Sequence, residues 1–156
     1  MGGNFIAAAR SRTLGFKELS MRVLSLSGEE RKKIEMSITN LYRSKSGVRG
    51  EHLYYFEAEK QYPKTAASSD RGCNDVSLFR GWMSADGKGG LGLMDNQLSF
   101  TDCDRKGPSF ATPLGMMNLQ NRTFLFVREH GWEDESYLIL ELNHSGLHRV
   151  LETFGG

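Results

Sequence analysis

Hydrophobic and polar residues follow a helical period in the first third of the chain and an alternating period after it. From Ile34 the apolar positions recur at i, i+4 and i+7, and Ser27 and Glu30 have the spacing of an N-terminal capping box. Gly47 is suited to end a helix. The pattern therefore predicts an amphipathic helix from Ser27 to Gly47, whose narrow apolar stripe packs on a larger surface. Residues 1–14 lack periodicity and are predicted to be loose.

After Gly50 short runs of strand-forming residues alternate with turns. Gln120-Asn121 has the length of a two-residue hairpin loop, and Pro113 indicates an edge strand or a bulge. A bend or break is predicted at Asp95-Asn96. The last segment also fits a helical stripe, but the hairpin-like connections before it favour a strand. The predicted strand segments are "HLYYFEAE", "DVSLFRGWM", "LGLMDNQLSF", "SFATPLGMMNL", "RTFLFVRE", "SYLILEL" and "LHRVLETF".

This order predicts an α+β fold that is mostly antiparallel β, with an N-terminal helix packed on a six- or seven-stranded meander, sandwich or small barrel. Residues 1–50 would form a loose N-terminus and a basic helical arm, and residues 51–156 an antiparallel β domain, together one structural unit. A length of 156 residues with 38% hydrophobic and 25% charged residues is typical of one soluble globular domain. No run approaches the roughly 18 apolar residues that cross a bilayer, so no transmembrane segment is expected.

Charge is distributed unevenly along the chain. Residues 1–50 hold ten Lys or Arg against four Asp or Glu, a net +6, whereas residues 51–156 hold ten against fifteen, a net −5. A basic arm of this kind attracts polyanions or folds back on its own acidic domain, and we favour the second because the charges are not densely clustered. Nucleic acid is therefore not expected as a partner. The candidate basic patch consists of Arg22, Arg31, Lys32, Lys33, Arg43 and Lys45.

The only two cysteines, Cys73 and Cys103, lie near predicted strand ends. A bridge across this span would stabilise the fold by roughly 3–4 kcal/mol, and two free thiols are the alternative. A nucleophilic role is disfavoured because Asp102 and Asp104 flank Cys103, and their charges raise the pKa of its thiol.

Asp95, Asp102 and Asp104 are weak candidates for a cation site, since alternating aspartates point the same way in a strand. Arg105 and Lys106 follow at once and would neutralise these carboxylates, so a turn with local salt bridges is favoured. No metal site and no cofactor are expected.

A third cluster lies in "REHGWEDES", where Glu129, His130 and Asp134 surround Trp132. A carboxylate and an imidazole together are able to perform general acid–base chemistry, so these three residues are weak catalytic candidates. The alternative is a solvated acidic hairpin tip that Trp132 fixes to the sheet.

The segments "YYFEAEKQYP", "GWMSADGKGGLGLM", "DCDRKGPSFATPLGMMNL" and "GWEDESYLILEL" resemble a pattern in uncharacterised bacterial proteins with β-rich domains of exported type. The resemblance covers residues 53–156. It implies a disulfide between Cys73 and Cys103 and an extracytoplasmic or exported location, although the first residues make a poor signal peptide. It implies no biochemical activity.

The leading hypothesis is a non-catalytic binding or interaction domain that recognises a protein or cell-surface ligand through its turns. Its predicted aromatic anchors are Tyr54, Tyr55, Trp82 and Trp132. The alternatives are a carboxylate- and histidine-dependent hydrolase, and polyanion binding through the basic N-terminal helix. The sequence does not indicate an oligomeric state.

Overall fold

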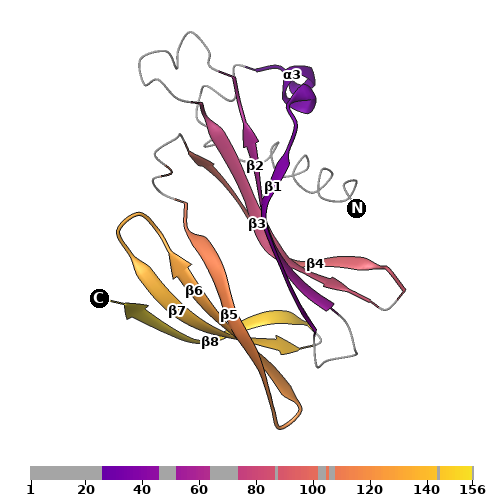
Figure 1. Ribbon diagram of the computed structural model, residues 1–156, viewed down its shortest axis with the longest axis vertical. Helices are drawn as coiled ribbons and strands as arrows, with labels where there is room; N and C mark the ends of the chain where they lie inside the picture. Colours follow the sequence, from indigo (N-terminus) through magenta and orange to yellow (C-terminus); the bar gives the residue numbers. More distant parts are fainter. Residues whose placement is uncertain are drawn as a thin grey trace.

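The computed structural model describes residues 26–45, 52–63, 74–86, 88–101, 105, 108–143 and 145–155, which form one short helix and eight antiparallel strands. Figure 1 shows the strands as two twisted layers, one in purple and pink and one in orange and yellow. The first sheet contains β1 (Ser37–Lys45), β2 (His52–Gln61), β3 (Val76–Ala85) and β4 (Leu91–Thr101) in that order. The second sheet contains β5 (Phe110–Leu119), β6 (Arg122–His130), β7 (Glu135–Asn143) and β8 (Gly146–Gly155).

The predicted helix from Ser27 to Gly47 is wrong beyond its first turns. Helix α3 spans only Gly28–Lys33 and is followed by strand β1, which is why the fold has one strand more than the seven predicted segments. The capping box itself is confirmed, because the Ser27 hydroxyl accepts from the Glu30 amide at 3.2 Å and the Glu30 carboxylate accepts from the Ser27 amide at 2.8 Å. Gly47 lies outside the described residues. No helix in the described ranges is long and apolar enough to span a membrane.

A bulge in β1 explains why this segment has a helical period in the sequence. Ile38 pairs with Ala58 and Leu41 pairs with Phe56, so one residue of β1 is inserted between Ile38 and Asn40. The insertion places Ile38 and Leu41 on the same side of the strand, although an odd spacing normally puts two residues on opposite sides. A bulged strand therefore imitates the i, i+3 spacing of a helix.

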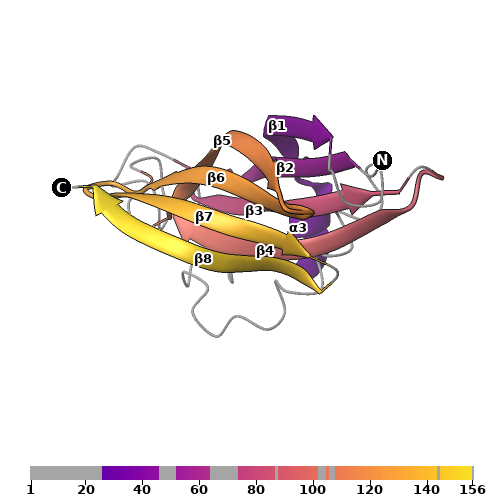
Figure 2. The same cartoon turned by 90° about the horizontal axis from the view of Figure 1, so that it is seen from below.

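The predicted strands after residue 50 are all confirmed, including the last one. Gln120 and Asn121 form the β5–β6 hairpin turn with φ values of 49° and 62°. Two successive positive φ values are the geometry of the tight turn that matches the twist of paired strands. Figure 2 shows the hairpins of the second sheet running side by side across the first sheet.

Alternate side chains of both sheets meet in the main core. Leu53 and Tyr55 of β2 and Trp82 of β3 pack against the inward residues of the second sheet. Leu138 and Leu142 are buried in this cluster and Leu140 packs against it, as their alternation predicts. The inward residues of β5 and β6 in the cluster are Ala111, Leu125 and Val127.

The opposite side of the first sheet is also buried. Phe56, Phe79, Met83 and Leu98 form a second apolar cluster there, and Phe56 is 0% exposed. Register places these residues on the face turned away from the second sheet, because their neighbours Tyr55 and Trp82 point into the main core. The first sheet is therefore buried on both faces around this cluster, whereas Ile38, Leu41 and Leu93 are exposed on its outer side.

Each edge strand of the described sheets carries a bulge. Register shifts insert one residue into β1, β4, β5 and β8, at Thr39, Met94, Leu114 and Val150. The central pairs β2·β3 and β6·β7 keep one register throughout their described lengths. The position of Pro113, beside the bulge of an edge strand, confirms its prediction, and the bend expected at Asp95 is the bulge at Met94. Bulges at edges discourage pairing with a further strand.

Candidate functional site

The outward side chains of the second sheet form rows across its strands, and we call the three central rows the open face. The central row is apolar, and Phe126, Ile139 and Leu151 are its large residues. Leu151 is 49% exposed, and Phe126 and Ile139 are half-buried. The three rows are Met117, Phe124, Glu141 and His148; Gly115, Phe126, Ile139 and Leu151; and Thr112, Arg128, Tyr137 and Thr153.

Ion pairs lie on both sides of the apolar row. Arg122 donates from Nε and Nη2 to the two carboxylate oxygens of Glu141, at 2.7 Å each. These hydrogen bonds lower the pKa of the Glu141 carboxyl. On the other side Arg128 lies 4.0 Å from Glu135, which also accepts from the Tyr137 hydroxyl at 2.5 Å. The charged groups of this surface are therefore paired with one another.

Aromatic side chains gather at the end of the open face next to the β6–β7 turn. The rings of Phe110 and His130 stack with centroids 5.8 Å apart, and Tyr137 is 40% exposed. Trp132, in the turn itself, is 60% exposed. Tyrosine and tryptophan of this kind are the residues that most often anchor protein interfaces.

Exposed large hydrophobic residues in the described part of the chain are concentrated on β5–β8 and their turns. Eight lie there, namely Leu114, Met117, Leu119, Trp132, Tyr137, Val150, Leu151 and Phe154. The other four, Ile38, Leu41, Tyr42 and Leu93, belong to the first sheet. Register places Met117, Tyr137 and Leu151 in the open face, and Ile38, Leu41 and Leu93 on the outer side of the first sheet.

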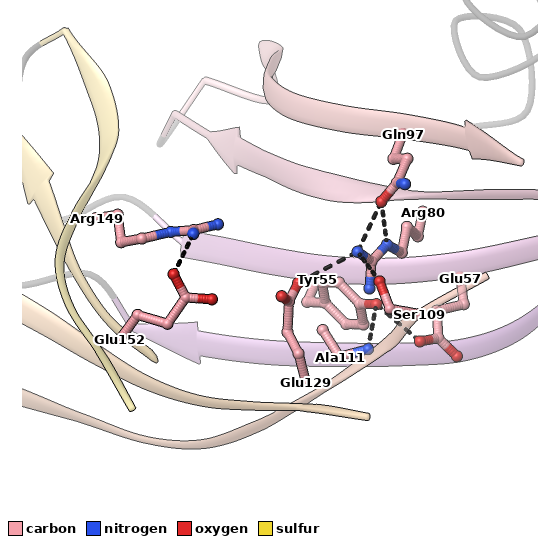
Figure 3. A network of polar contacts seen from close by, with 9 residues as sticks. All are labelled: Tyr55, Glu57, Arg80, Gln97, Ser109, Ala111, Glu129, Arg149 and Glu152. Atoms are coloured by element: carbon pink, nitrogen blue, oxygen red, sulfur yellow. Dashed lines mark hydrogen bonds and ion pairs between the residues drawn. The ribbon is translucent and has the colours of Figure 1, made fainter. Parts of the chain in front are cut away.

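A polar cluster joins the two sheets at one end of the core, as Figure 3 shows. Arg80 of β3 donates through Nη2 to Ser109 at 2.9 Å and to Glu129 of β6 at 3.2 Å. Its Nε and Nη2 also donate to the Gln97 side chain at 2.9 and 2.6 Å. Because Glu129 and Arg80 come from opposite sheets, their ion pair connects the two layers.

Tyr55 belongs to the same cluster. Its hydroxyl donates to Glu57 at 2.7 Å and accepts from the Ala111 amide at 3.3 Å. Burial, followed by the hydrogen bond to Glu57 and the charge of that group, raises the pKa of Tyr55 above its ordinary value. The other Glu57 oxygen accepts from Asn40 at 2.5 Å. The hydrogen-bond partners in this cluster come from the two sheets and from Ser109, so we interpret the cluster as a structural connection between the sheets.

The weak catalytic candidates are separated by the alternation of β6. Glu129 points inward to Arg80, whereas His130 points outward and stacks on Phe110. Asp134 lies in the turn, where its carbonyl oxygen accepts from the Gly131 amide at 2.8 Å. The described geometry therefore brings no two of these three side chains together.

The candidate basic patch is divided between two ends of the first sheet. Arg31, Lys32 and Lys33 lie in α3, and Lys32 pairs with Glu29. Arg43 and Lys45 lie at the far end of β1, with Arg43 in contact with His52 at 2.7 Å. Nine strand residues span about 30 Å, so the two groups are far apart (Figure 1). Arg22 lies outside the described residues.

Two of the four predicted anchors are core residues. Tyr55 and Trp82 are buried between the sheets, so their assignment as surface anchors is wrong. Tyr54 is half-buried and packs against the second cluster, which leaves Trp132 as the exposed member. Sequence alternation alone did not show which face of β2 and β3 would be covered, because both faces of these strands are apolar.

Of the two cysteines and three candidate cation ligands, the described residues include only Asp95. Cys73, Cys103, Asp102 and Asp104 lie outside the described residues, so the disulfide stays a prediction. Asp95 is exposed on β4 opposite Trp82. Among the described residues no group of three or more His, Cys, Asp or Glu side chains is arranged to hold a metal ion. Arg105 pairs with Glu59 at 2.7 Å.

One contact was not anticipated from the sequence. The Ser145 hydroxyl lies 2.9 Å from His148 Nε2 and 2.7 Å from Asn143 Oδ1. A serine next to an imidazole is the first element of a nucleophilic site. Here Asn143 Oδ1 also accepts from the Ser145 amide at 2.9 Å, so the cluster stabilises the exposed β7–β8 turn.

Comparison with protein-family models, with curated proteins and with solved structures gave no match to this chain.

Proposed function

We propose that the chain is a non-catalytic binding domain of β-sandwich architecture that recognises a protein partner through the open face. The observation that carries the proposal is the contiguous apolar row of the open face. Phe126, Ile139 and Leu151 lie side by side across β6, β7 and β8, and Leu151 and Tyr137 are in contact with solvent. A contiguous apolar row of this kind, bordered by polar groups, is typical of an interaction surface.

The bulged sheet edges and the β6–β7 turn indicate which surface a partner would contact. Bulges in all four described edge strands disfavour the addition of a partner strand, so recognition through a sheet face has more support. The expected contribution of the turns remains, because Trp132 lies in the β6–β7 turn at the rim of the open face. Tyr137 and Trp132 are the proposed anchors.

Two alternative functions have less support. Hydrolysis needs a base and a second catalytic group within hydrogen-bond reach, and Glu129 and His130 point to opposite faces. Polyanion binding needs a continuous basic surface, and the described basic residues lie in two separate groups.

Site-specific photo-crosslinking tests the proposal. A photoreactive phenylalanine analogue replaces Tyr137 on the open face or, as the control, Leu93 on the first sheet, two positions of nearly equal exposure at 40% and 42%. In cells that make the protein naturally, we expect a discrete crosslinked protein from position 137 and none from position 93. Equal crosslinking from both positions, or none from 137, would contradict the proposal.

A further inference from the structure

We propose that the partner of the open face is a second copy of the same chain, in a two-fold dimer whose axis follows the central apolar row. This inference rests on the proposed function, because it names the partner of the same surface. Four features of the molecule support it, namely the charge of the face, the symmetry of its rows, the bulged sheet edges and the area of the face.

The charge of the surface suits a neutral partner. Arg122 and Arg128 are balanced by Glu141 and Glu135, and each arginine is paired with its neighbour on the same sheet. These four charges therefore sum to zero when the histidines are neutral, and Glu133 and Asp134 lie beyond them in the β6–β7 turn. A strongly charged partner would gain little from such a surface, whereas a second copy presents an equally neutral one.

The rows of the face are compatible with a two-fold axis. An axis along the apolar row places Phe126, Ile139 and Leu151 each opposite its own counterpart. The two flanking rows then exchange, so that Tyr137 faces Glu141 of the second copy and Arg128 faces Phe124 of the second copy. No like charges meet in these rows. Phe124 is buried beneath Arg122 and the Tyr137 hydroxyl donates to Glu135 of its own chain, so the apolar row supplies most of the contact.

The blocked edges favour this closed arrangement. Edge-to-edge pairing would extend the sheets, and the bulges at Leu114 and Val150 disturb both edges of the second sheet. A two-fold face-to-face contact uses the same patch on both copies and therefore closes on itself without forming a filament. Two sheets stacked in this way keep a spacing of about 10 Å.

The area of the face sets the strength of the contact. Four strands at about 4.8 Å spacing and nine residues at about 3.3 Å rise give roughly 550 Å² for each copy. The total of roughly 1,100 Å² is just under the standard range of about 1,200–2,000 Å² for stable complexes. The dimer is therefore expected to be weak, with a dissociation constant on the order of micromolar or higher.

Sedimentation velocity of the full chain between about 1 μM and 1 mM tests the inference. We expect the wild type to change from monomer to dimer in this range. Leu151→Glu and Leu151→Lys should each weaken the dimer at least about tenfold, because each places like charges opposite one another. Leu93→Glu, at a similarly exposed position of the first sheet, should dimerise like the wild type.

An equimolar mixture of the two Leu151 variants provides the decisive comparison. If Leu151 faces itself across the axis, the mixture should dimerise at least as well as the wild type although neither variant does so alone. A mixture that stays monomeric, variants that dimerise normally, or a wild type that is monomeric throughout would each overturn the inference. A monomeric wild type would leave the proposed function to be decided by the crosslink from position 137.

Photo-crosslinking of the purified chain leaves the apolar row intact, so its result does not depend on whether the Leu151 variants fold. The photoreactive analogue at Tyr137 in the purified chain should give a product of twice the chain mass, attached near Glu141 of the second copy. Attachment within the first sheet, or no product at the highest concentration, would contradict the proposed dimer.

Discussion

At the scale of one residue, Tyr55 combines a buried aromatic ring with a hydroxyl group that hydrogen-bonds to both sheets. The side chain is 2% exposed, yet its hydroxyl connects Glu57 of its own strand to the Ala111 amide of the second sheet. A buried hydroxyl with both a donor and an acceptor partner is costly to remove, because each partner is left without its hydrogen bond. The aromatic ring also packs on Trp82, with centroids 5.0 Å apart.

Tyr55→Phe should therefore lower the free energy of unfolding by about 1–3 kcal/mol at neutral pH. Tyr137→Phe removes a hydroxyl that donates to Glu135 on the exposed surface, and its effect should stay within about 0.5 kcal/mol. Urea unfolding of the three proteins measures both changes. Equal small losses for the two variants would show that the hydroxyl of Tyr55 does not join the sheets.

The same residue predicts a dependence of stability on alkaline pH. Burial and Glu57 raise the pKa of Tyr55 in the folded chain, whereas the unfolded chain has the ordinary value near 10. The folded chain therefore keeps a proton that the unfolded chain releases, so this contribution is complete below about pH 10 and declines above it by about 1.4 kcal/mol per pH unit. Unfolding experiments at pH 8 and 11 should show that the stability difference between wild type and Tyr55→Phe shrinks by about 1.4 kcal/mol. A constant difference would refute this assignment.

At the scale of the element, the four described edge strands share one feature, a β-bulge. Each has an inserted residue, and the inserted residue of β8, Val150, is half-exposed beside the open face. Such insertions twist a strand and interrupt its row of backbone donors and acceptors. The four bulges thus protect an antiparallel fold whose edges would otherwise remain available to other chains.

Deleting Val150 should convert β8 into a regular edge strand. Arg149 and Leu151 already point to opposite sides, so the deletion keeps the remaining side chains on their present faces. We expect faster formation of strand-paired oligomers or fibrils, measured by thioflavin fluorescence and light scattering. Val150→Ala retains the inserted residue and should behave like the wild type. Equal solubility of the deletion and the wild type would argue against a protective role for the bulge.

The sequence predicted the positions of the strands in the β domain better than it predicted which of their side chains are buried. Alternation and turn residues located seven strands and the Gln120-Asn121 hairpin, because both depend on local backbone preferences. The β1 strand was missed because its bulge gives Ile38 and Leu41 the spacing of a helix. The burial of Tyr55 and Trp82 depends on which sheet faces are covered, and that is decided by contacts between segments far apart in the chain.

At the scale of the whole molecule, two sheets with similar topology have different outer surfaces. The outer side of the first sheet is buried around Phe56 and exposed at its edge strands, whereas the second sheet carries the apolar row of Phe126, Ile139 and Leu151 across its strands. Exposing such a row is unfavourable for an isolated domain, because apolar surface removed from water is worth about 25 cal/mol per Å². A binding partner for this face offsets that cost, and both proposals follow from this row.

Backbone amide NMR spectra of the wild-type chain at increasing concentration test this account most directly, because they need no substitution and report on every strand. We predict concentration-dependent shifts that cluster at Phe126, Ile139 and Leu151 and their neighbours on β5–β8. Shifts confined to β1–β4, or spectra that do not change up to about 1 mM, would contradict self-recognition through the open face.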